Sequence, residues 1–104
     1  MAIVDITIIP IGTNSSSVSD FVAEIHKTLD QFKDKVKVQL TPMSTLIEGE
    51  LDDLFEVIKV IHEVPFNKGA HRVATNIRID DRRDKPLKMT EKVMKVQKKM
   101  NSSS

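Results

Sequence analysis

The sequence predicts an α+β domain whose elements follow the order βαββαβ, with one more helix at the C-terminus. Four short segments are rich in β-branched residues or alternate apolar with polar residues, and three other segments repeat apolar residues every three or four positions. This order is that of a ferredoxin-like sandwich, in which two helices cover one face of a four-stranded antiparallel sheet. The 104 residues suffice for one domain. We expect that domain over residues 1–100 and a disordered tail over residues 101–104.

The first strand and the first helix are predicted over residues 3–9 and about 18–34. Residues 3–9 are β-branched except for Asp5, and we expect Pro10 and Gly12 to end the strand. A serine-rich loop follows, whose serines suit a helix N-cap. The predicted apolar stripe of the helix consists of Val18, Phe21, Val22, Ile25, Leu29 and Phe32.

A pair of short strands is predicted next. Residues 36–41 alternate, and this pattern directs Val36, Val38 and Leu40 toward the helices. Pro42 interrupts the pattern, so the strand should lie at an edge of the sheet or end there. Residues 43–48 form the return strand, which we expect Gly49 to stop.

The second half of the chain repeats the scheme. A helix follows Gly49 and should end at Pro65, because proline cannot continue a helix without losing a hydrogen bond. Residues 72–79 form the last strand. The predicted stripe of the second helix is Leu51, Leu54, Phe55, Ile58 and Ile61, and that of the C-terminal helix is Met89, Val93, Val96 and Met100.

Composition narrows the classes of partner. The 16 basic and 15 acidic residues leave a net charge of +1, and aromatic residues make up only 4% of the chain. Neither an electrostatic footprint nor a base-stacking platform for nucleic acid is therefore expected. The chain has no cysteine, and no apolar run is long enough to span a bilayer. We expect a cytoplasmic protein that binds neither nucleic acid nor membrane.

The sheet face opposite the helices should be polar and open. Because the first and last strands are antiparallel neighbours, Asp5 and Thr7 should lie near Arg72, Asn76 or Arg78. This face could be a solvated sheet surface, a subunit interface or part of a ligand pocket. Two isoleucines at positions 3 and 9 on the same face favour a subunit interface.

Catalytic signals are weak. The three histidines show no metal-binding spacing, and the sequence contains neither a phosphate-binding glycine loop nor a cofactor motif. We therefore expect no cofactor, no metal and no enzymatic activity. Acid–base catalysis by His62 and Glu63 is the remaining enzymatic hypothesis.

The return strand carries the clearest polar cluster. Ser44, Thr45 and Glu48 place two hydroxyls and a carboxylate on one short segment, which could hydrogen-bond a heteroaromatic ligand. The alternative is turn chemistry around Pro42 and the start of a helix near Gly49.

Several runs resemble a known family. The run PMSTLIEG (42–49), together with PIGT (10–13), His62-Glu63 and RVATNIRIDDR (72–82), is similar to the small thiamine-binding protein family over nearly the whole chain. The resemblance implies a ferredoxin-like fold, dimers that pair into tetramers, and binding of thiamine or its hydroxymethylpyrimidine portion. It implies no established enzymatic activity.

The resemblance also implies a ligand site. It places Ser44, Thr45 and Glu48 in the pocket, with Ser17 closing one side and with Asn76 and Arg78 as further candidates. In this hypothesis Glu48 accepts a hydrogen bond from the exocyclic amine of the pyrimidine. The alternative function is an oligomeric interaction module that binds no ligand and uses its open face for subunit contacts.

Overall fold

The computed structural model describes residues 1–12 and 18–84. The predicted C-terminal helix, the tail over residues 101–104 and Ser17 lie outside the described residues. Within them the chain forms seven elements in the order βαββαβ, with a 3₁₀ turn after the first helix. They are β1 (Ala2–Ile11), α1 (Val18–Leu29), η1 (Asp30–Phe32), β2 (Lys37–Leu40), β3 (Thr45–Gly49), α2 (Leu51–Asn67) and β4 (Arg72–Asp81).

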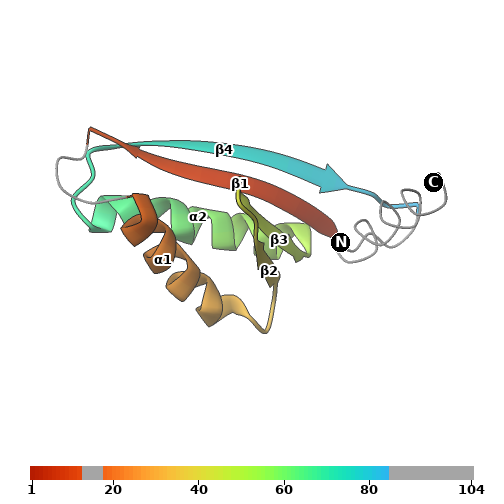
Figure 1. Ribbon diagram of the computed structural model, residues 1–104. Helices are drawn as coiled ribbons and strands as arrows, with labels where there is room; N and C mark the ends of the chain where they lie inside the picture. The colour runs from red at the N-terminus through yellow and green to blue at the C-terminus, as the bar shows by residue number, and fades with distance from the viewer. Residues whose placement is uncertain (13–17, 85–104) are drawn as a thin grey trace, which may run out of the picture.

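The four strands form one antiparallel sheet in the order β2-β3-β1-β4. This is an α+β arrangement with two helices, and its strand order matches the split βαβ scheme of ferredoxin-like domains. Strand β1 pairs with β4 over its whole length, from Ala2 opposite Asp81 to Ile11 opposite Arg72. The two long strands run side by side above α2, while β2 and β3 form a short hairpin (Figure 1).

Strand β1 does not end at Pro10, as the sequence suggested, but continues to Ile11. Proline is tolerated in a strand only where its missing N–H is not needed for the ladder. Strand β3 pairs with β1 only from Ala2 to Ile6, so one side of β1 has no strand partner at Pro10. The pairing of Pro10 with Val73 of β4 therefore continues without the N–H.

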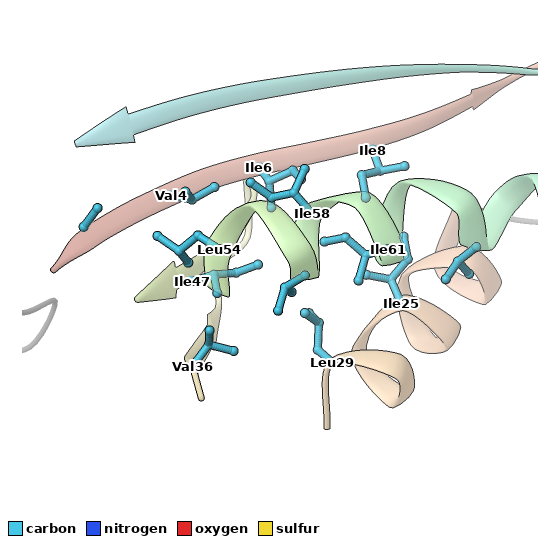
Figure 2. Close-up of a cluster of buried hydrophobic side chains, with 13 residues drawn as sticks. Val4, Ile6, Ile8, Ile25, Leu29, Val36, Ile47, Leu54, Ile58 and Ile61 are labelled. Atoms are coloured by element: carbon cyan, nitrogen blue, oxygen red, sulfur yellow. The ribbon is translucent and has the colours of Figure 1, made fainter. Parts of the chain in front are cut away.

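The hydrophobic core lies between the sheet and the two helices. Alternate residues of β1 point down from the strand onto α2, and side chains from α1 and β3 close the layer (Figure 2). Because successive strand residues point to opposite faces, these positions have the period of two that the sequence shows. The labelled members of this cluster are Val4, Ile6, Ile8, Ile25, Leu29, Val36, Ile47, Leu54, Ile58 and Ile61.

The prediction that Val36, Val38 and Leu40 are all covered by the helices is wrong for the last two. Val36 is 4% exposed, but Val38 is 36% and Leu40 is 61% exposed. Val38 lies opposite buried Ile47 in the ladder and so has the predicted facing. Strand β2 is, however, the edge of the sheet, and an open hollow of about 670 Å³ separates it from the end of α1.

Helix α2 differs from its prediction at two positions. Phe55 is 51% exposed, because the buried stripe runs through Leu54, Val57 and Ile61 and turns away from Phe55. Pro65 lies inside the helix, which continues to Asn67. Proline disrupts only the bond to the preceding turn, so the residues after it can keep helical angles. Among the described residues, no helix combines the length and the apolar character needed to cross a membrane.

Candidate functional site

A cavity of about 280 Å³ opens between α1, β1 and the turn that joins β2 to β3. Most of its lining is apolar, which is the usual character of a small-molecule pocket. It lies where α1, which packs against α2, leaves the edge strand β2 uncovered. The apolar side chains include Ile6, Ile8, Val22, Ile25, Leu40 and Ile61.

The turn at one side of the cavity is held by Thr41. Its hydroxyl donates to the carbonyl oxygen of Ser44 at 2.7 Å and accepts from the backbone N–H of Ser44 at 3.0 Å. The backbone N–H of Thr41 also donates to the Ser44 carbonyl oxygen at 2.9 Å. Pro42 therefore lies in a hairpin turn at the end of β2, as its position predicted. This turn presents the hydroxyl-bearing residues Ser44 and Thr45 to the cavity.

The imidazole of His26 lies beside these hydroxyl groups and also lines the cavity. Its Nε2 lies 3.1 Å from Oγ1 of Thr45, which links α1 to β3. Burial lowers the pKa of His26 below its ordinary value. Sequence reasoning missed this residue as a site member, because His26 follows buried Ile25 by one position and its partner is 19 residues away. The helical period places His26 at the edge of the buried stripe, but it does not show which residue the imidazole contacts.

The structure separates the predicted site residues into two groups. Ser44 and Thr45 lie together at the cavity. Glu48, Asn76 and Arg78 are on the other face of the sheet, because they pair with β1 residues whose side chains point away from the helices. Ser17 lies outside the described residues.

The open face has the pairing that the sequence predicted for it. Asn76 lies opposite Thr7, and the guanidinium of Arg78 lies 3.0 Å from the carboxylate of Asp5. Glu48 is only 5% exposed, and its cross-strand neighbours are Ile3 and Lys37. Glu48 does not line the cavity. The predicted contact between the Glu48 carboxylate and a ligand would therefore require the ligand to bind on the open face.

The second histidine of interest, His62, lies on α2 away from this cavity. Its Nδ1 is 2.7 Å from Oγ1 of Thr75 in β4, and its ring meets the ring of Phe66 edge-on at 5.6 Å. Glu63 is exposed beside it. These contacts give His62 a structural role that links α2 to the sheet.

Comparison with known proteins gives consistent matches over almost the whole chain. The family model described as "Thiamine-binding protein" matches residues 4–97. The UPF0045 protein YqgV of Bacillus subtilis is 63% identical over 100 residues, which cover 94% of this chain and 96% of that protein.

Solved structures share the fold. A hypothetical protein from Methanocaldococcus jannaschii has a TM-score of 0.76 and 30% identity, over 92% of this chain and 95% of that one. A Thermotoga maritima protein described as a candidate for thiamine biosynthesis or salvage has a TM-score of 0.74 over 91% of this chain and 97% of its own. Its identity is 19%, so it supports the fold alone.

Proposed function

Because the chain belongs to the thiamine-binding protein family, we propose that it binds thiamine or the hydroxymethylpyrimidine portion of thiamine in the cavity beside α1. The observation that carries the proposal is the cavity itself, which is mostly apolar and has a few polar groups at one end. Such a lining covers the faces of a flat ring while the polar groups contact its edge. We propose further that the protein binds this ligand without transforming it.

The chemistry of the polar end suits a pyrimidine. The ring nitrogens accept hydrogen bonds, and the hydroxyls of Ser44 and Thr45 can donate them. The exocyclic amine donates, and it can reach a hydroxyl oxygen or a backbone carbonyl oxygen of the turn. The volume of about 280 Å³ lies just below the range of typical ligand pockets, which is about 300 to 1,000 Å³. A single ring therefore fits this cavity better than a large cofactor does.

Calorimetric titration with thiamine and with hydroxymethylpyrimidine tests the binding proposal. We expect saturable binding, and Thr45→Val should weaken it about fivefold, since a lost hydrogen bond is worth about 1 kcal/mol. Thr75→Val is the matched control, because Thr75 also bonds a histidine but lies away from the cavity. Folded protein that gives no heat at millimolar ligand, or equal weakening by both variants, would contradict the proposal.

A separate incubation tests the absence of catalysis. Thiamine held with a stoichiometric amount of protein for hours should be recovered unchanged by chromatography. Conversion that disappears in a His62→Ala variant would instead support the acid–base hypothesis.

An interaction module is the second candidate function, and the open face favours it. Ile3 is buried against Leu46 on that face, while Ile9 and Ile11 are large apolar residues exposed along the same side of β1. Exposed apolar groups of this kind are typical of protein contacts. We propose that the protein is cytoplasmic and that it is a homo-oligomer whose open face meets another copy.

A further inference from the structure

Two histidine–threonine pairs connect the helices to the sheet. His26 of α1 bonds Thr45 of β3 through Nε2 at 3.1 Å, and His62 of α2 bonds Thr75 of β4 through Nδ1 at 2.7 Å. Both histidines are half-buried, and each hydroxyl can act as donor or acceptor. The two pairs therefore resemble each other in chemistry and in their place between helix and sheet.

Only one pair belongs to the cavity. His26 and Thr45 both line it, whereas His62 and Thr75 do not. Among the described lining residues, His26 is the one with a side chain that titrates near neutral pH. Its Nε2 bonds Thr45, and its Nδ1 has no hydrogen-bond partner within the described part of the chain.

We propose that His26 contacts the ligand and must be uncharged for the ligand to bind, so that the cavity empties as the solution becomes acidic. This inference rests on the proposed function, because it assigns a specificity residue to the same cavity. An imidazolium ion beside the ring would repel a cationic ligand such as thiamine and would lose its acceptor nitrogen for any ligand. In neutral imidazole Nε2–H can donate to the Thr45 hydroxyl, which leaves Nδ1 as an acceptor for the edge of the ring.

The surroundings of His26 support this assignment. The parts of β1, β3 and α2 that line the cavity carry no charged side chain. Within residues 1–12 and 18–84, charged groups share the adjoining hollow with His26, where Asp30 and Lys33 follow α1 and Lys37 begins β2. One carboxylate faces two ammonium groups there, so this hollow does not favour the imidazolium. Partial burial lowers the pKa of His26 in the same direction.

Calorimetric titration between about pH 5 and pH 8 tests the proposal, with hydroxymethylpyrimidine and thiamine as probes. Below the pKa of His26, the Kd of the unaltered protein should rise up to about tenfold for each pH unit. His26→Gln keeps a donor and an acceptor but cannot become charged, so that part of the pH dependence should disappear. His62→Gln, the matched control, should keep it. Protonation of the ligand itself changes the Kd by the same factor for the unaltered protein and for both variants.

An NMR titration of the histidine ring protons provides a second test that needs no variant. Saturating ligand should move the titration of His26 to lower pH and leave that of His62 in place. The proposal is overturned if His26→Gln retains the full pH dependence, or if ligand leaves the His26 titration unchanged. Absence of binding at every pH would instead overturn the proposed function, and this inference with it.

Discussion

Gly49 allows the end of β3 to approach the segment before β2. A Cβ atom at this position would lie 2.9 Å from Cγ1 of Val36 and 3.3 Å from the carbonyl oxygen of Lys35. Because Val36 is buried in the core, its side chain has little room to move. The sequence suggested that Gly49 stops a strand, whereas the structure shows that it is the last strand residue and is needed for close packing.

Gly49→Ala should therefore destabilise the fold. We expect the free energy of unfolding to fall by about 1–3 kcal/mol, which is typical of overpacking in a core. Urea denaturation followed by circular dichroism measures this change. An unchanged midpoint would show that Val36 and the backbone of Lys35 can move aside without cost.

His26 should make stability depend on pH. Its pKa in the folded protein is lowered by burial, so the unfolded chain binds a proton at this site more readily. The contribution of His26 to the free energy of unfolding is fully present well above pH 6.5, the ordinary pKa of histidine. This contribution is lost as the pH falls below 6.5. In thermal unfolding from about pH 7.5 to about pH 5.5, His26→Gln should lose less stability than the unaltered protein. A steeper loss of stability in the variant would contradict the expected direction of the pH dependence.

At the scale of single residues, the sequence predicted the site only in part. Ser44 and Thr45 could be found because they follow Pro42 in a turn and carry hydroxyls. His26 could not, since its partner comes from another element and only the fold brings them together. The cluster of Ser44, Thr45 and Glu48 looked continuous in sequence, but strand alternation sends Thr45 and Glu48 to opposite faces.

At the scale of elements, the sequence predicted the order and type of the four strands and of the two described α-helices, mainly from their apolar periods. It did not predict η1, because the apolar stripe of the helix predicted over about 18–34 continues to Phe32, whereas α1 ends at Leu29. The coverage of the edge strand and the ends of the elements were harder to predict. The pattern of β2 is that of a half-buried strand, yet its coverage depends on where α1 lies, which no local pattern encodes. Pro10 and Pro65 also lie inside elements, because their neighbours in space tolerate a missing N–H.

A buried leucine and an exposed leucine test how strongly the burial of a side chain determines its contribution to stability. Leu54→Ala in α2, where the side chain is 1% exposed, should lower the free energy of unfolding by about 2–5 kcal/mol. Leu40→Ala in β2 should lower it by less than about 0.5 kcal/mol. Because Leu40 lines the cavity, the same change should weaken ligand binding. Urea denaturation and calorimetric titration of both variants check this, and equal destabilisation would contradict it.

At the scale of the whole molecule, the two faces of the sheet differ in character. Its helix-covered face holds the core and borders the cavity, and its open face carries the Asp5–Arg78 ion pair and exposed isoleucines of β1. We expect light scattering to report a homo-oligomer, with a tetramer as the form implied by the family resemblance. Ile11→Lys should shift the assembly toward monomer, because it places a charge among the apolar groups. Ile11 is the better test than Ile9, since Ile9 also lines the cavity. A monomeric unaltered protein at micromolar concentration would contradict this.

We expect a small ring to bind between α1 and the β2–β3 turn. A crystal structure of the protein with bound hydroxymethylpyrimidine tests it most directly. We predict density for the ring in the cavity, with its edge against His26 and Thr45. Density for the ring on the opposite face, beside Glu48 and Arg78, would contradict the claim and would return the site to the residues that the sequence resemblance implied.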